Sequence, residues 1–202
     1  MSRTLYFVRH GQTSWNAQKR LLGHKDIQLD DTGRTQATDA GICLRWLNEH
    51  FAGLDFVSGP LGRTRETMEI IRETVGLVPG SYQLDEGFKE VDYGRWEGLT
   101  WAEVRERDPA GFQSKDADPW GYTMPDGESY EAAAERVRAA LKRITRNSVI
   151  VSHGGICRTV LVLLCGVDSR LAPTLAIPQN KILVLRDGGF AWLQATTDLV
   201  VW

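Results

Sequence analysis

The stretch Leu5–Gly11, which reads LYFVRHG, sets a short apolar run directly before a histidine and a glycine. A continuous run of this kind is typical of a strand that is buried on both faces, as the strands of parallel sheets are. The same arrangement returns far along the chain, where Val149–Gly154 reads VIVSHG. The sequence therefore predicts two buried strands, each ending at a His-Gly pair.

Further apolar runs alternate with helical patterns along the chain. Two more strands are predicted at 54–57 and 182–185, and the return strand of an edge hairpin is predicted at 190–193. Helices are predicted at about 37–51, 61–75, 129–144 and 156–165, and the last is apolar almost all round. This alternation predicts a single α/β domain over 1–202, a three-layer sandwich with helices on both faces of a mainly parallel sheet.

Residues 99–127 interrupt this pattern and are predicted to form a small cap-like insertion. The part from Asp108 to Gly127 holds three prolines and three glycines, which is too many breakers for a regular element. It also holds three aromatic residues, which a plain linker does not need. Two interpretations stay open for this segment, a rim over a binding site and a packed surface loop.

Both His-Gly pairs directly follow a predicted strand. In a parallel sheet the carboxyl ends of the strands form one edge, and ligands bind at that edge. We therefore expect His10 and His153 to face one crevice, although they lie far apart in the sequence. The glycine after each histidine allows backbone N–H groups to approach a bound anion closely. For either histidine alone a structural role is the simpler interpretation, whereas the two pairs together favour a site.

Five short blocks occur in order between residue 5 and about residue 155. They read Leu5-x-x-x-Arg9-His10-Gly11-Gln12-Thr13-x-x-Asn16, Ser58-Gly59-Pro60-Leu61-Gly62-Arg63-x-x-x-Thr67, Glu90-Val91-Asp92-Tyr93-Gly94-x-Trp96-Glu97-Gly98, Pro125-x-Gly127-Glu128-Ser129 and Ser152-His153-Gly154-Gly155. In these blocks the chain resembles the histidine phosphatase superfamily, the phosphoglycerate-mutase-like group. The resemblance implies transfer of a phosphoryl group through a phosphohistidine.

The resemblance places the nucleophile at His10. An imidazole must be neutral to attack phosphorus, and neighbouring guanidinium groups disfavour its protonated form. Arg9 and Arg63 would supply that positive charge. They would also hold the phosphoryl oxygens in a bidentate fork, which lysine does less well.

The resemblance also implies a set of donors around the transferred group. His153 and Asn16 would donate hydrogen bonds to the phosphoryl oxygens, together with backbone N–H groups near Gly154. Gln12 completes the substrate-binding residues that we expect. No metal and no other cofactor are expected, because these side chains would themselves neutralise the phosphoryl charge.

A proton donor for the leaving alcohol is expected among the carboxylates of the third block. Another branch of the family uses an aspartate directly after the second histidine, but this chain has Gly154 there, so Glu90 is the predicted general acid. Water later needs a base to attack the phosphohistidine, and the same carboxyl can serve. Asp92 and Glu97 remain alternatives to Glu90.

Composition excludes several classes of protein. Lys and Arg number 24 against 26 Asp and Glu, which leaves no basic stripe or tail for nucleic acid or an anionic membrane. The longest purely apolar run, Val160–Cys165, is far shorter than the roughly 18 residues that span a bilayer. Three cysteines without metal-ligand spacing predict a reducing, cytoplasmic location. The edge hairpin leaves room for a homodimer.

Three functions remain open at this point. Hydrolysis of a small-molecule phosphate ester is favoured over phosphoglycerate mutase activity, because the segment after Glu90 offers one lysine, Lys115, and no adjacent arginine pair for a doubly anionic substrate. We therefore expect an alcohol that is apolar or neutral. A catalytically silent protein that only binds phosphorylated ligands is the third candidate, and the presence of every proposed catalytic residue argues against it.

Overall fold

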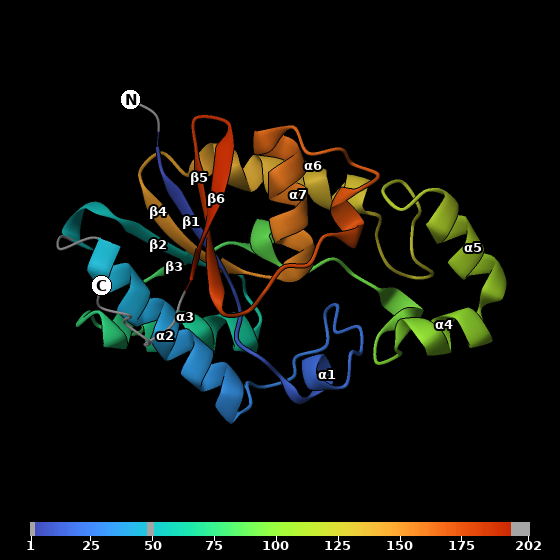
Figure 1. Ribbon diagram of the computed structural model, residues 1–202, viewed down its shortest axis with the longest axis horizontal. Helices are drawn as coiled ribbons and strands as arrows, with labels where there is room; N and C mark the ends of the chain where they lie inside the picture. Colours follow the sequence, from blue (N-terminus) through green and yellow to red (C-terminus); the bar gives the residue numbers. More distant parts are fainter. Residues whose placement is uncertain (1–2, 48–50, 195–202) are drawn as a thin grey trace, which may run out of the picture.

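The computed structural model describes residues 3–47 and 51–194 of the chain, and its centre is a six-stranded sheet in the order β3-β2-β4-β1-β5-β6 (Figure 1). The strands are β1 (Leu5–Arg9), β2 (Asp55–Ser58), β3 (Gln83–Leu84), β4 (Ser148–Ser152), β5 (Lys181–Arg186) and β6 (Gly189–Gln194). The first four pair in parallel, whereas β5 runs antiparallel to β1 and forms a hairpin with β6. The predicted strands and the edge hairpin are confirmed, and the two-residue strand β3 was not predicted.

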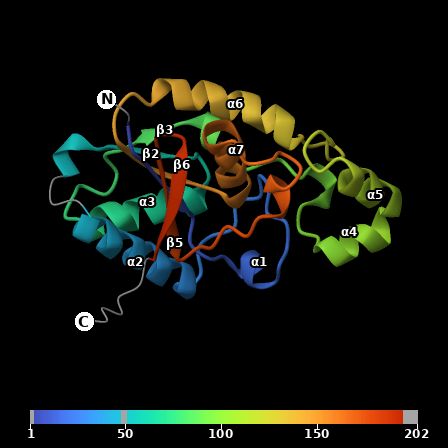
Figure 2. The ribbon, with the colours of Figure 1, turned by 45° about the horizontal axis from the view of Figure 1, so that its top comes forward.

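Helices cover both faces of the sheet (Figures 1 and 2). On one face lie α2 (Asp31–Leu47) and α3 (Gly62–Thr74), and on the other lie α6 (Tyr130–Arg143) and α7 (Gly154–Cys165). Neighbouring side chains of β1 pack on opposite faces of the sheet, because side chains alternate along a strand. Phe7 packs with α6 and α7, whereas Val8 packs with α2 and α3. The predicted three-layer α/β sandwich is confirmed.

Short elements occupy the connections. They are α1 (Ser14–Ala17), α4 (Trp101–Arg107), α5 (Pro109–Ala117) and the 3₁₀ turns η1 (Phe51–Gly53), η2 (Glu86–Phe88), η3 (Gly94–Trp96) and η4 (Ala172–Thr174). In the described part of the chain, no helix is long and apolar enough to cross a membrane.

The expectation that 108–127 holds no regular element is wrong, because α5 lies within it. The breakers sit where a helix tolerates them. Asp108 precedes the helix and accepts a hydrogen bond from the Gly111 N–H, and Pro109 occupies the first helical turn, where its missing N–H costs nothing. With α4, this helix stands beside the sandwich (Figures 1 and 2).

The packing of the layer formed by α6 and α7 can be tested at the contact between Phe7 and Phe88. Both side chains are fully buried, and their rings meet edge to face with centroids 5.9 Å apart. Replacing Phe88 by alanine should lower the free energy of unfolding by about 3 to 5 kcal/mol. Phe190→Ala, at a half-exposed position of β6, is the control and should cost less than about 1 kcal/mol. Urea denaturation measures both, and equal losses would contradict this packing.

Candidate active site

The parallel pairing of β1 with β4 brings the two histidines together. Arg9 stands opposite Ser152 in the ladder, and the His10 N–H donates to the Ser152 carbonyl at 2.9 Å. His10 and His153, which follow these two residues, are both buried, and their ring centroids are 5.1 Å apart. The expectation that the two imidazoles converge at one edge of the sheet is therefore confirmed.

The two imidazole rings differ in the hydrogen bonds that their nitrogens form. Nδ1 of His10 lies 2.8 Å from the Gly11 carbonyl, which can only accept, so Nδ1 carries the proton and Nε2 keeps its lone pair. His153 precedes α7, and within the described part of the chain neither of its ring nitrogens has a hydrogen-bond partner. A buried polar atom without a partner is costly, so His153 is suited to a ligand that supplies one.

The two predicted arginines are held by backbone carbonyls. Arg63, fully buried in the first turn of α3, donates from Nη1 to Lys25 at 2.6 Å and from Nη2 to Gly23 at 2.8 Å. Arg9 donates from Nη1 to Ile177 at 2.7 Å. The Nε atoms of both are buried and unpartnered among the described residues. In the described part of the chain neither guanidinium forms a direct ion pair with a carboxylate, so the unpartnered N–H groups remain available to an anion.

Burial, together with these charges, determines the protonation of the histidines. Burial lowers the pKa of His10 well below its ordinary value, and the charges of Arg63 and Arg9 lower it further. Burial and Arg63 also lower the pKa of His153 well below the ordinary value. Burial lowers the pKa of Arg63 itself to about 10, so this side chain is still charged at neutral pH. The neutral imidazole that nucleophilic attack requires is therefore the dominant form of His10.

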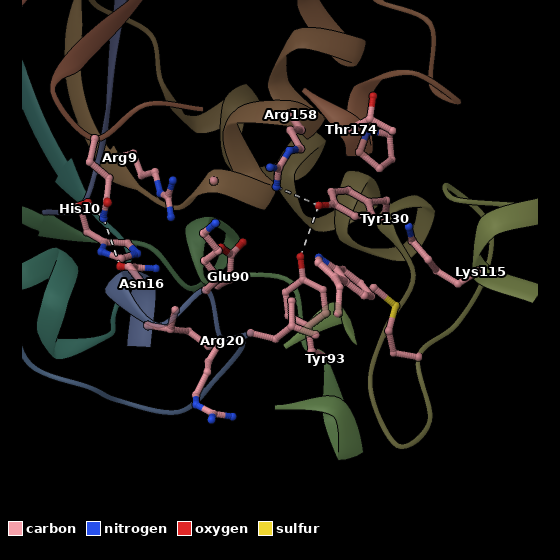
Figure 3. Close-up of a pocket in the computed structure, with 18 of the residues that line it drawn as sticks. Arg9, His10, Asn16, Arg20, Glu90, Tyr93, Lys115, Tyr130, Arg158 and Thr174 are labelled. Atoms are coloured by element: carbon pink, nitrogen blue, oxygen red, sulfur yellow. Dashed lines mark hydrogen bonds between the residues drawn. The ribbon is translucent and has the colours of Figure 1, made fainter. Parts of the chain in front are cut away.

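Glu90 lies beside the N-terminus of α7. Its Oε1 accepts from the Val91 N–H at 2.9 Å and from the Gly155 N–H at 3.1 Å, which leaves Oε2 with only a longer contact of 3.4 Å to the same Gly155 N–H. Glu90 and Gly154 both line the cavity next to His10. In Figure 3 Glu90 lies between the side of the cavity that holds Arg9 and His10 and the side that holds Tyr93 and Tyr130.

The alternative carboxylates have other partners. Asp92 accepts from the Gly94 N–H at 2.8 Å and lies 3.2 Å from Nδ1 of His24. Glu97 accepts from the His24 N–H at 2.6 Å, and burial raises its pKa. Within the described part of the chain, Glu90 is the only carboxylate that lines the cavity.

Asn16 and Gln12 differ in position. Asn16 lines the cavity, and its Oδ1 accepts from the Thr13 N–H at 3.2 Å and from Nε2 of Gln179 at 3.1 Å. Because Oδ1 is occupied in this way, the amide nitrogen of Asn16 is the group left to donate. Gln12 instead donates from Nε2 to Asp30 at 3.1 Å and is not among the residues that line the cavity. Its proposed contact with substrate stays a prediction.

The cavity extends well beyond the histidines, with a volume of about 520 Å³. Its wall carries the cationic side chains of Arg9, Lys19, Arg20, Lys115 and Arg158. Aromatic rings line it as well, from Tyr93, Trp101, Phe112 and Tyr130. Arg20 is paired with Glu103 at 2.8 Å, so its charge is compensated.

Sequence reasoning did not assign Arg158 to the site. It donates from Nε to the Leu175 carbonyl at 2.9 Å and from Nη1 to the Tyr130 hydroxyl at 3.3 Å, both uncharged partners (Figure 3). The available signal was a charged residue within a predicted helix that is otherwise apolar. Lys115 lines the same cavity, with Nζ 4.7 Å from the centre of the Trp101 ring, and burial lowers its pKa. The cap segment thus contributes to the same wall as α7.

A neutral buried imidazole, two guanidinium groups without a direct carboxylate partner in the described part of the chain and one nearby carboxylate are the groups that phosphoryl transfer to a histidine requires. Comparison with known proteins agrees with this class. The model of the histidine phosphatase superfamily, branch 1, matches residues 5–195, and the chain belongs to this superfamily. The predicted family is thereby confirmed.

Relatives of the chain include phosphatases and mutases. An acid phosphatase of Mycobacterium tuberculosis is 35% identical over 165 residues, covering 78% of this chain and 73% of the relative. A 2,3-bisphosphoglycerate-dependent phosphoglycerate mutase of Methylorubrum populi is 29% identical over 194 residues, covering 92% and 90%. The structure of a mycobacterial glucosyl-3-phosphoglycerate phosphatase with VO3 superposes with a TM-score of 0.79 at 28% identity, covering 95% and 96%. The phosphatase relatives support the predicted hydrolysis of phosphate esters.

The depressed pKa of His10 makes stability depend on pH. The unfolded chain binds a proton at His10 below about pH 6.5, whereas the folded chain does not, so stability is fully present above that pH and falls as the pH decreases. Wild type should lose about 1 kcal/mol more than His10→Gln between pH 7.5 and 5.5. Urea denaturation in phosphate-free buffer measures this difference. Identical losses in the two proteins would show that His10 is not held neutral.

Proposed function

We propose that the protein hydrolyses phosphate monoesters in two steps through a phosphohistidine on His10. Nε2 of His10 attacks phosphorus, the bond from phosphorus to the ester oxygen breaks, and Glu90 gives its proton to the departing alcohol. Water then attacks the phosphohistidine, Glu90 takes a proton from it, and the bond from phosphorus to Nε2 breaks to release phosphate. The observation that carries the proposal is the buried His10 ring, with Nδ1 bonded to Gly11 and Nε2 free beside Arg9 and Glu90.

The remaining site residues would stabilise the charge that develops on the phosphoryl oxygens. Arg9 and Arg63 have unused N–H groups, and the amide nitrogen of Asn16 is free to donate. His153 has unpartnered ring nitrogens. Preorganised donors of this kind are each worth about 3 to 4 kcal/mol in a transition state. Because side chains supply this charge, we propose that the reaction is independent of a metal.

We propose a cytoplasmic location, because free thiols are typical of a reducing compartment. The cysteines Cys43, Cys157 and Cys165 are all free. We propose further that the enzyme is a phosphomonoesterase of the acid phosphatase type, whereas the homodimer and the absence of nucleic-acid partners remain predictions. We also propose that 99–127 acts as a cap, since Trp101, Lys115 and Met124 from this segment line the cavity.

The cationic wall changes the substrate that we expect. The sequence alone favoured a neutral or apolar alcohol, because the segment after Glu90 offers one lysine, Lys115, and no adjacent arginine pair. Arg158 adds a second charge to that wall, and its direct partners are uncharged. We therefore propose that the alcohol carries its own anionic group, which Arg158 and Lys115 bind, while the aromatic rings cover its apolar faces.

A mutase and a silent binder differ from this proposal in what happens to the phosphoryl group. A mutase returns the group from the histidine to a second hydroxyl, and a silent binder never forms the covalent intermediate. The mutase relatives keep the first alternative open. The intermediate and its acceptor are therefore the quantities to measure.

Brief exposure to a ³²P-labelled monoester, followed by denaturing quench, should label the protein with acid-labile, base-stable phosphate. The label should be absent from His10→Ala and should chase into inorganic phosphate in wild type. Transfer of the label mainly to a second hydroxyl of a phosphoglycerate would identify a mutase. A protein that binds the ester but never becomes labelled or turns it over would be the silent binder.

Replacing Arg158 by methionine should raise KM for 3-phosphoglycerate by about tenfold, because a charged hydrogen bond is worth roughly 1.5 to 3 kcal/mol. KM for butyl phosphate, whose alcohol is neutral, should change less than about twofold by the same reasoning. Arg170→Met, at an exposed position outside the cavity, is the control and should alter neither. Steady-state kinetics on the two esters check this, and equal changes on both would contradict an anionic alcohol.

A further inference from the structure

The segment that carries Glu90 has no secondary structure of its own. Residues 89–93 lie between η2 and η3, in neither a helix nor a strand. The carboxyl of Glu90 is anchored to α7 through the Gly155 N–H, but this bond alone does not hold the backbone that bears it. The backbone carbonyls of the segment need donors from elsewhere, because buried carbonyls are costly when unpaired.

Arg136, in the middle of α6, supplies these donors. Its Nη1 donates to the carbonyls of Gly87 at 3.0 Å and Lys89 at 2.7 Å, and its Nη2 donates to the carbonyl of Glu90 at 2.9 Å. The same guanidinium also binds Glu128 in bidentate fashion, through Nε at 3.2 Å and Nη2 at 2.5 Å. These five contacts equal the five N–H groups of an arginine.

Glu128 binds the backbone on the C-terminal side of Glu90. Its Oε1 accepts from the Asp92 N–H at 3.1 Å, and its own N–H donates to the Asp92 carbonyl at 3.0 Å. The Glu90 carbonyl accepts a further bond from Nε2 of His24 at 2.9 Å. The backbone is thus held on both sides of Glu90, and Arg136 is the residue that connects these contacts to a rigid helix.

We infer that Arg136, together with Glu128, is a positioning residue that fixes the Glu90 carboxyl against the reacting ester. This inference rests on the proposed role of Glu90 as the proton donor. Arg136 is not among the residues that line the cavity. It acts through the backbone of Glu90, and a displacement of about 1 Å in a catalytic group can cost a hundredfold in rate.

Arg136→Lys keeps the positive charge but replaces the planar fork with one compact ammonium. The expected loss falls on esters whose alcohol needs a proton. For butyl phosphate, kcat/KM should decrease on the order of tenfold, whereas for p-nitrophenyl phosphate, whose leaving group needs little protonation, it should change less than about threefold. The ratio kcat/KM is the right quantity because it includes only the steps up to release of the alcohol.

Arg143→Lys is the matched control. Arg143 lies two turns further along α6 and also forms a bidentate pair, with Asp85 at 2.9 and 2.6 Å, but it does not contact Glu90. Arg143→Lys should leave kcat/KM unchanged for both esters. Glu128→Gln, which keeps Arg136 and its carbonyl contacts, serves as the second variant if Arg136→Lys does not fold, and it should show a smaller loss with the same preference for butyl phosphate.

Glu90→Gln is the reference variant for both the proton-donor role of Glu90 and the positioning role of Arg136. It should reduce kcat/KM for butyl phosphate on the order of a hundredfold, with a much smaller effect on p-nitrophenyl phosphate. Adding Arg136→Lys to Glu90→Gln should then cause no further loss, because there is no proton donor left to position. If Glu90→Gln behaves in this way but Arg136→Lys slows both esters equally, or the two losses multiply, the inference is overturned. Equal losses on both esters in Glu90→Gln would overturn the proton-donor role itself, and the inference with it.

Discussion

The parallel pairing of β1 with β4 is the constraint on which the rest of the site depends. It sets Arg9 opposite Ser152, so that the next residue of each strand is a histidine at the same edge of the sheet. The bond from the His10 N–H to the Ser152 carbonyl continues the ladder one step past the strands. A slip of one residue would turn each side chain to the opposite face and separate the rings, because side chains alternate along a strand.

The fold carries an electrostatic cost at this edge. Arg63, His10 and His153 are buried within a few residues of the strand ends, as is the Nε atom of Arg9, and several of these nitrogens have no partner among the described residues. Backbone carbonyls satisfy part of Arg9 and Arg63 without cancelling their charges. Each unpaired buried group costs about 1 to 3 kcal/mol, which the two packed layers of the sandwich must offset. Burial and the charges of Arg63 and Arg9 keep His10 neutral, and the unpartnered N–H groups stay free for an anion.

The leaving-group side is organised differently. There α4, α5, α6 and α7 each contribute side chains, and polar groups alternate with aromatic rings. Tyr130 begins α6, while Arg136 on the same helix holds the backbone of Glu90. One helix therefore connects the proposed recognition of the alcohol to the proposed delivery of its proton.

The linear sequence determined the strands other than β3, the principal helices, the superfamily and the pair of histidines, because buried strands and motif blocks leave local patterns of residue type. It also pointed to Glu90 over Asp92 and Glu97, a preference that agrees with the cavity lining. It missed α5, since a proline and a capping aspartate look alike in a helix and in a loop. The presence of Arg158 and Lys115 at one cavity, and the hydrogen bonds of Arg136 to the Glu90 backbone, were decided by tertiary structure alone. Arg136 reaches residues tens of positions away through hydrogen bonds to carbonyls, which every residue possesses and no residue type reveals.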